Sequence, residues 1–353
     1  MARCLLTVWV AVWLILAVGC SHFTLRTENR VTVDGPVESR VVTELAPVAK
    51  AGPVRPVIVE AGCGAGTVAV VDVDGLLLNT PFVGPSSLGE NPVALFREKL
   101  DAAAADGSIA AIVLRVHSPG GSVAACQMMR EELLRFKSRT QKPVVACLLD
   151  QATGGAYVVA AAADEVYAGP ATLTGGFGVI LNLYNLRDLM AQFNIIPQPI
   201  LAGRHADLAT GARALTDEES AMLKAIAEHL HGQIVAAIRQ SRSGLVKAPD
   251  ATFDGRIFTA EQALKDGLID GIADLPRAIQ RAAALGGITN LPATVVLYRR
   301  RNDPAHSVYA ISANVPLQGS GLLPSVPGVD RSKLPTFLSV WQPELTLERL
   351  GGK

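Results

Sequence analysis

The sequence predicts an α/β fold in which a largely parallel, buried sheet is flanked by helices. Segments rich in Val and Ile alternate along the chain with amphipathic or small-residue segments, the order expected when crossover helices join parallel strands. The strand segments are continuous apolar runs, which is typical of strands covered on both faces. Hydrophobic residues make up 49% of the chain and charged residues 18%, so a large core can form.

Four strands and four helices are predicted from residue 67 onward. Each strand is a β-branched or apolar run that is bounded by Gly, Pro or polar residues. One helix has Pro at its first position, where no N–H is needed, and another ends in basic residues that suit its C-terminal dipole. The predicted strands are residues 67–73, 109–116, 144–149 and 165–168, and the predicted helices are residues 92–105, 123–139, 156–163 and 217–239.

The predicted globular domain spans residues 65–285. Before it, residues 20–64 are rich in Val, Pro and Thr and lack helical or alternating periodicity, which predicts a flexible tether. After it, the periodic pattern weakens and Gly, Pro and Ser cluster, which predicts an irregular C-terminal extension over residues 286–353. Residues 1–19 form a separate leader.

The leader resembles a lipoprotein signal peptide. Residues 5–18 are an almost wholly apolar run, too short to span a membrane comfortably but suited to the apolar region of a signal peptide. The run leads into Ala17-Val18-Gly19-Cys20, which resembles the bacterial lipobox, whose Cys is diacylated. We therefore expect export to the cell envelope and membrane attachment through lipidated Cys20. An uncleaved anchor or an ordinary secretory signal is the alternative.

Composition excludes several classes of function. The chain has 32 Lys and Arg residues against 32 Asp and Glu, so no bulk positive charge is available to hold nucleic acid. After the leader and Cys20, three cysteines remain (Cys63, Cys126 and Cys147). Their odd number and the lack of a CxxC pair argue against a disulfide framework and a zinc site. We expect no metal and no cofactor.

Three loops carry the candidate chemistry. The first, Ser118-Pro119-Gly120-Gly121-Ser122, joins a predicted strand to a predicted helix, and its glycines let backbone N–H groups face outward beside a helix N-terminus. That arrangement suits an oxyanion hole, and a plain strand–helix turn is the alternative. The other two loops are Asp-Gln-Ala-Thr-Gly-Gly-Ala-Tyr at residues 150–157 and Leu-Thr-Gly-Gly-Phe-Gly-Val at residues 173–179.

Together, and in this order, the three loops resemble the signal peptide peptidase A (protease IV) family of serine peptidases. The resemblance implies a crotonase/Clp-like spiral of ββα units, in membrane-attached, ring-forming enzymes that cleave peptides such as remnants of signal sequences. It also implies a Ser–Lys dyad, in which the Lys takes the proton of the Ser. Backbone N–H groups of Gly120, Gly121 and Gly155 would then stabilise the oxyanion. The resemblance covers residues 67–285 and includes the segments 202–207, 215–219, 254–260 and 263–270.

This chain departs from the family at the dyad. Aligned without a gap, the family Ser falls on Gly154; a shifted alignment places it on Thr153, with one extra residue before Asp164. We prefer the ungapped alignment, because an inserted residue would rotate the buried face of the following helix by about 100°. The family Lys falls on Ala206, and Gly176 replaces a hydroxyl residue in the third loop.

Polar groups are lost only from the site, whereas the other family motifs are kept. This pattern favours a family member whose dyad is impaired or absent. Such a protein would bind an extended peptide or a partner, or serve as a scaffold. Two alternatives remain. Thr153 could act as nucleophile with His205 or His117 as base, because imidazole has a suitable pKa. A crotonase-like acyl-thioester enzyme would use the same oxyanion turn. The expected partners are peptides, the membrane and further copies in a homo-oligomeric ring, with no nucleic acid.

Overall fold

The computed structural model describes residues 52–63, 66–81, 90–245, 248–301, 303–311 and 337–341, together with the strands β1 (Phe23–Thr24) and β2 (Ala46–Pro47), which pair with each other. The predicted signal peptide, Cys20 and most of the predicted tether lie outside the described residues. Within the described residues, no helix combines the length and the apolar character needed to cross a membrane.

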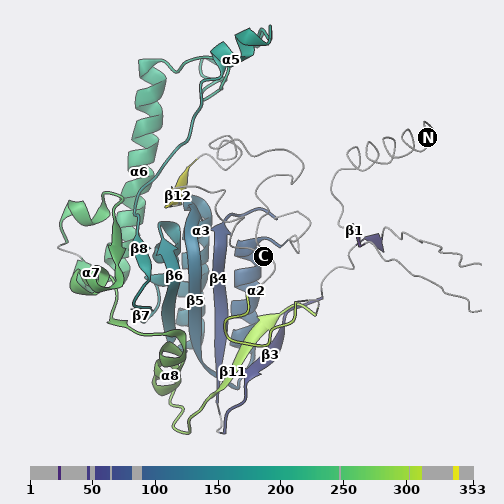
Figure 1. Ribbon diagram of the computed structural model, residues 1–353, viewed down its shortest axis with the longest axis vertical. Helices are drawn as coiled ribbons and strands as arrows, with labels where there is room; N and C mark the ends of the chain where they lie inside the picture. The colour runs from purple at the N-terminus through teal and green to yellow at the C-terminus, as the bar shows by residue number, and fades with distance from the viewer. Residues whose placement is uncertain are drawn as a thin grey trace, which may run out of the picture.

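A ten-stranded, mostly parallel sheet forms the centre of the body (Figure 1). Its main path runs β10-β7-β6-β5-β4-β11-β3, and every neighbouring pair on that path is parallel except β11 with β3. The predicted α/β class and the largely parallel sheet flanked by helices are therefore confirmed. The strands are β3 (Arg55–Glu60), β4 (Thr67–Leu77), β5 (Ile109–Ser122), β6 (Val144–Thr153), β7 (Glu165–Ala168), β8 (Leu173–Gly175), β9 (Ile257–Thr259), β10 (Gly271–Ile272), β11 (Thr294–Arg299) and β12 (Leu338–Val340).

Helices cover both faces of the sheet. On one face, apolar side chains of α2, α3, α4 and the C-terminal half of α6 share a core with β4, β5 and β6. On the other face, α8 packs against the alternate residues of the same strands. The helices are α2 (Pro92–Ala105), α3 (Val123–Thr140), α4 (Gly155–Ala160), α5 (Arg187–Gln192), α6 (Asp217–Ser241), α7 (Ala260–Lys265) and α8 (Leu275–Leu285), with short 3-10 turns at Ser243–Leu245 and Asp250–Phe253.

Side-chain caps determine where the main helices begin. The side-chain oxygen of Asn91 accepts a hydrogen bond from Val93 N at 3.0 Å, directly before Pro92 opens α2. Ser122 caps α3 through Ala125 N, and a reciprocal capping box opens α6. These caps explain why the helix starts predicted at residues 92, 123 and 217 are confirmed.

Two of the predicted boundaries are wrong. Residues 55–60, placed in the predicted tether 20–64, form β3 at the edge of the sheet. Residues 294–299, placed in the predicted irregular extension 286–353, form β11, which is buried between β3 and β4. The two strands come from opposite ends of the sequence and complete one sheet. A local pattern cannot reveal such pairing, because β3 is stabilised by β11, and β11 by β3 and β4, which lie far from it in the chain.

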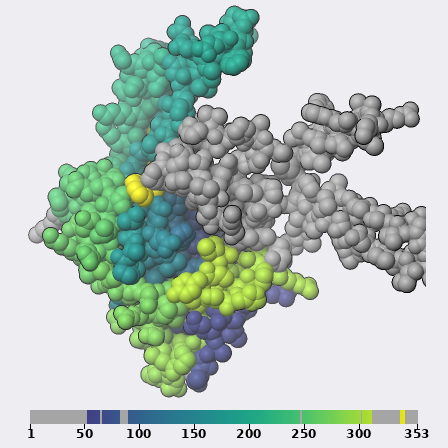
Figure 2. Space-filling model, in the orientation of Figure 1, coloured from purple at the N-terminus to yellow at the C-terminus, as the bar shows by residue number. Residues whose placement is uncertain are grey.

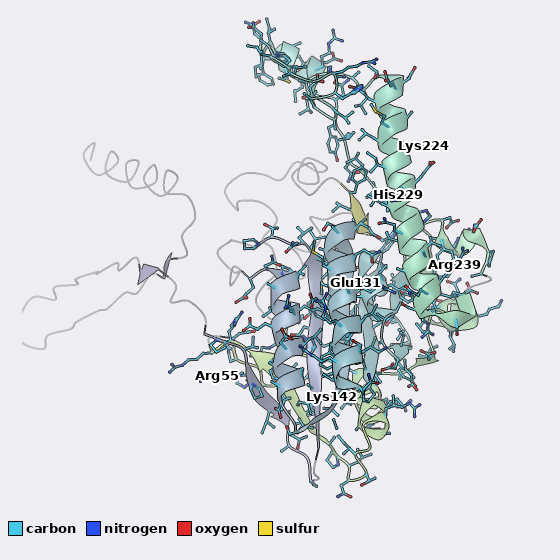
Figure 3. The ribbon with its side chains drawn as sticks, turned by 180° about the vertical axis from the view of Figure 1, so that it is seen from behind. Arg55, Glu131, Lys142, Lys224, His229 and Arg239 are labelled. Carbon is cyan, nitrogen blue, oxygen red and sulfur yellow. The ribbon has the colours of Figure 1, made fainter. Side chains whose placement is uncertain are left out.

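α6 projects from the body and carries a long arm. Its C-terminal half is anchored by buried Ile234 and Ile238, whereas Figure 1 shows α5 and its neighbouring coil at the far end. Figure 3 shows Lys224 and His229 on the projecting part of the helix and Arg239 beside the body. The first turn of α6 lies about 20 Å from Ile234 along the axis, at about 1.5 Å per residue.

Candidate functional site

Gly154 lies at the sharp turn between β6 and α4. Its backbone has φ 54° and ψ −127°, and its N–H donates to Gly175 O at 2.8 Å. Hydrolytic nucleophiles often occupy a strained strand-to-helix turn of this kind, because it exposes the side chain. The geometry therefore favours the ungapped alignment, in which Gly154 holds the family Ser position. With no side chain, Gly154 cannot attack a substrate.

The hydroxyl of Thr153 is buried and occupied by local hydrogen bonds. Thr153 has no exposed surface, and its Oγ1 lies 3.1 Å from Pro119 O and accepts from Gln151 Nε2 at 3.1 Å. His117, one of the candidate bases, is half-buried and lies near a different group: its Nδ1 is 3.9 Å from Asp150 Oδ2. No imidazole or ammonium group is among the hydrogen-bond partners that the structure describes for Thr153 Oγ1.

His205 and Ala206 lie at the far end of the arm. The ring nitrogens of His205 are 4.0 Å from carboxylate oxygens of Glu218 and Glu219, at the start of α6. The N–H of Ala206 donates within the same coil, to Gly203 O at 3.2 Å. The structure therefore does not bring the candidate base or the family Lys position to Gly154 within one chain.

The glycines of the predicted oxyanion region do come together. Ser118 orders the first loop, because its Oγ donates to Gly75 O at 2.6 Å and accepts from Gly120 N at 3.1 Å. A Cβ added to Gly120 would lie 3.0 Å from both Gly155 N and Thr153 O. The backbone at Gly120 thus approaches the backbone at residues 153–155 so closely that only glycine fits at residue 120. The last residues of β5 and the start of α4 form one site with Gly154 between them.

Cys126 packs directly against this site without being reactive. A Cβ on Gly155 would overlap the sulfur of Cys126 and lie 2.8 Å from its Cβ. Burial raises the pKa of the Cys126 thiol to about 12, so it stays protonated at neutral pH and cannot act as a thiolate nucleophile. Cys147 is also buried, with its pKa raised to about 12, as expected for core cysteines.

Residues 337–341 lie across the site as an extended strand. β12 within this segment pairs antiparallel with the end of β5, and Ser339 is opposite Gly121. On its other side, Leu338 exchanges two backbone hydrogen bonds with Ile180, of 2.9 and 3.0 Å. Figure 2 shows the yellow atoms of this segment against the teal region of the body, at the base of the arm. Residues 338–340 therefore fill the space between the end of β5 and Ile180 as an added strand, and this space is called the groove below.

Sequence reasoning identified the two loops that contain Pro119 and Gln151, but it missed residues 337–341, which contact them. Gln151 donates to Trp341 O at 2.6 Å, and Trp341 N donates to Pro119 O at 3.0 Å. The run Phe-Leu-Ser-Val-Trp at residues 337–341 has β propensity, and that was the available signal. It follows a Gly, Pro and Ser cluster, and its partner strand lies more than 200 residues earlier in the chain, so the segment was assigned to the irregular extension.

The family model and the curated relatives that this chain matches all indicate the same family of peptidases. Residues 136–289 match peptidase family S49. Protease 4 of Salmonella typhi is 28% identical over 220 residues, which are 62% of this chain and 35% of that protein. The chloroplastic serine protease SPPA of Arabidopsis thaliana is 33% identical over 225 residues, which are 63% of this chain and 31% of that protein. The chain thus spans about a third of the length of these two relatives.

A solved structure of the 1510-N membrane-bound stomatin-specific protease aligns with 69% of this chain and 100% of its own. The TM-score is 0.41 and the identity 13%.

Proposed function

Because this chain belongs to the signal peptide peptidase A (protease IV) family, we propose that it is an exported, membrane-attached member that binds extended peptides without cleaving them. The observation that carries this proposal is the chemistry of the turn at residues 153–155. The position suited to a nucleophile is Gly154, and the neighbouring Thr153 hydroxyl is buried against Pro119 O. A Ser–Lys mechanism needs an attacking hydroxyl and an amine to take its proton, and the described residues around Gly154 supply neither in the contacts given above.

Peptide binding is supported by the groove. A strand that adds to the end of β5 gains backbone hydrogen bonds whatever its sequence, and side-chain pockets then select among sequences. The pairing of residues 337–341 with Gly120 and Gly121 is an example of such addition. We extend this binding mode to peptides released from exported proteins, which would meet the groove at the membrane.

The two other hypotheses gain no support from the geometry. A Thr153 peptidase needs a base at Oγ1, but His205 lies beside Glu218 and Glu219 at the far end of α6. An acyl-thioester enzyme needs space for a ligand at Gly120, where residues 337–341 lie instead. Neither is favoured by a specific contact among the described residues.

A fluorophosphonate probe tests the non-catalytic proposal. The full chain in detergent is incubated with the probe, and covalent adducts are measured by mass spectrometry, with an active serine peptidase as positive control. We expect no adduct on the wild type and none on Thr153→Val. An adduct on the wild type that is lost in Thr153→Val would establish the Thr153 peptidase and overturn the proposal.

Membrane attachment is tested separately through Cys20. Cells that express the full chain are grown with labelled palmitate, and the purified protein is examined for label. We expect incorporation in the wild type and none in Cys20→Ala, because only the lipobox Cys receives acyl chains. Cys63→Ala is the matched control, because it removes an exposed cysteine of the body and should keep the label. Label that persists in Cys20→Ala would contradict the lipoprotein proposal.

A further inference from the structure

Residues 337–341 lie directly against Gly154 at the turn between β6 and α4. A Cβ on Gly154 would overlap the carbonyl oxygen of Ser339, and would lie 2.7 Å from Ser339 C and 3.1 Å from Val340 N. Optimal contacts between carbon atoms are about 3.5–4.0 Å, so a side chain at residue 154 and this segment cannot occupy these positions together. The peptide bond between Ser339 and Val340 lies directly over the family Ser position.

The segment also matches the groove through its side chains. Leu338 is buried with Leu76 and Leu78, and Val340 packs against the same small cluster. Ser339 faces the opposite way, as alternation along a strand requires, and it has no exposed surface. A larger side chain at residue 339 would therefore have no room. The groove accepts a large aliphatic residue, then a small residue, then a second aliphatic residue.

The segment is further held at both ends by backbone hydrogen bonds. Val123 N donates to Phe337 O at 3.4 Å, and Trp341 N donates to Pro119 O at 3.0 Å. At Trp341 O, the Gln151 amide donates at 2.6 Å and the Thr153 hydroxyl lies at 3.3 Å. These contacts engage backbone and side-chain polar groups that a second peptide in the same place would also have to reach.

We propose that residues 337–341 are the resident ligand of the peptide groove, and that Gly154 is required because only glycine admits them. This inference rests on the proposed peptide-binding function and names the partner of that same site. Glycine at the family Ser position then has two consequences. It removes the nucleophile, and it lets residues 337–341 lie against the turn at Gly154. An external peptide must displace residues 337–341 before it binds, since an intramolecular partner competes at high effective concentration.

Hydrogen exchange of the full chain tests the groove side of this proposal. We expect the amides of residues 337–341 to be protected in the wild type and to exchange at least about tenfold faster in Gly154→Ala, since each lost factor of ten corresponds to about 1.4 kcal/mol. Gly287→Ala is the matched control: Gly287 also has positive φ, 75°, but a Cβ there would meet no atom within 4 Å, so protection should be unchanged. Equal protection in Gly154→Ala and the wild type would overturn the requirement for glycine.

Peptide binding tests the segment side. The probe is a fluorescein-labelled peptide with the sequence of residues 335–341, Pro-Thr-Phe-Leu-Ser-Val-Trp, measured by anisotropy on full-length chains. We expect Ser339→Arg, which displaces the segment, to bind the probe at least about tenfold more tightly than the wild type. Ser339→Ala should behave as the wild type, because it fits the same space. Adding Gly154→Ala to Ser339→Arg should abolish probe binding.

The outcomes separate this inference from the proposed function. Failure of Ser339→Arg to bind the probe more tightly than the wild type would overturn the resident-ligand proposal, even if the chain remains inert to fluorophosphonate. If the hydrogen-exchange protection of residues 337–341 falls when the protein is diluted, the segment binds the groove of a neighbouring copy. That result would overturn the proposal that the segment binds within its own chain. Circular dichroism of each variant distinguishes displacement of the segment from loss of the fold.

Discussion

Asp72 shows how a single residue anchors this fold. Its carboxylate is buried at 9% exposure and is shared by Lys99 Nζ at 2.8 Å, Arg115 Nη2 at 2.8 Å and Arg299. Burial by itself raises the pKa of Asp72, but the three surrounding cations outweigh it and hold that pKa well below its usual range. Asp72 is therefore ionised at neutral pH.

Removing one cation from this cluster should be costly. Arg115 is completely buried and also pairs with Asp74 at 3.0 Å, so Arg115→Met removes the cation that the structure describes for Asp74 and one of the three that surround Asp72. We expect a loss of about 3–5 kcal/mol in the free energy of unfolding, measured by urea denaturation. Arg97→Met is the control, because Arg97 is 60% exposed and pairs only at the surface, and it should change stability by less than about 1 kcal/mol. Similar effects for the two variants would contradict the account.

At the scale of elements, an ion-pair clamp connects the arm coil to the start of α6. Arg213 donates to Asp207 at 2.7 Å and to Glu219 at 2.6 Å, and Glu219 also accepts from Thr216 N in the capping box. The Arg213 hydrogen bonds, followed by the bond from Thr216 N, lower the pKa of Glu219 to about 2. The hydrogen bonds from Arg213 lower the pKa of Asp207 as well. The clamp therefore depends on both carboxylates being ionised.

Acid should loosen this clamp before it unfolds the body. A carboxylate whose folded pKa is depressed stabilises the fold above its unfolded pKa, and this contribution is lost as pH falls toward the folded pKa. For Glu219 the window runs from about 4.5 down to about 2. We expect residues 203–216 to lose hydrogen-exchange protection, corrected for intrinsic rates, between pH 5 and pH 3. Glu219→Gln should loosen them at pH 7, whereas Glu228→Gln, whose exposed carboxylate pairs with Lys224 within α6, should not; equal behaviour of the two variants would argue against the clamp.

Elements with local signals could be predicted from the sequence, and elements made by distant pairing could not. α2 is correct at both ends because Pro92 and the Asn91 cap are local signals. β11 depends on β3 and β4, and β12 depends on the end of β5, so neighbouring residues do not identify them. The candidate glycines were identified from the motifs. The occupant of the groove was missed because its partner residues lie far away in the chain.

At the scale of the whole molecule, the arm presents apolar surface to solvent. Phe193 is 70% exposed, Ile196 72% and Ile200 100%, and all three lie in the segment that follows α5 in the chain. Exposed apolar groups that gather in this way mark interaction surfaces. We propose that the arm packs against another copy of the chain, as the ring predicted by the family resemblance requires.

Polar substitutions in the arm should weaken this association. We expect the triple variant Phe193→Ser, Ile196→Ser and Ile200→Ser to sediment as a smaller species than the wild type in detergent, because the buried apolar area of the contact is lost. Ile58→Ser is the control, since Ile58 is 64% exposed but lies on the edge strand β3, away from the arm. A triple variant that sediments like the wild type would exclude the arm as the contact.

The most direct measurement follows the fate of a peptide in the groove. The Ser339→Arg chain is incubated with the labelled peptide of residues 335–341, and the bound fraction is recovered and analysed by mass spectrometry. With no hydroxyl at residue 154 and no amine at residue 206, the peptide should be recovered bound and intact after prolonged incubation. Recovery of fragments cut between the Ser and the Val of the peptide, dependent on this chain, would contradict the account.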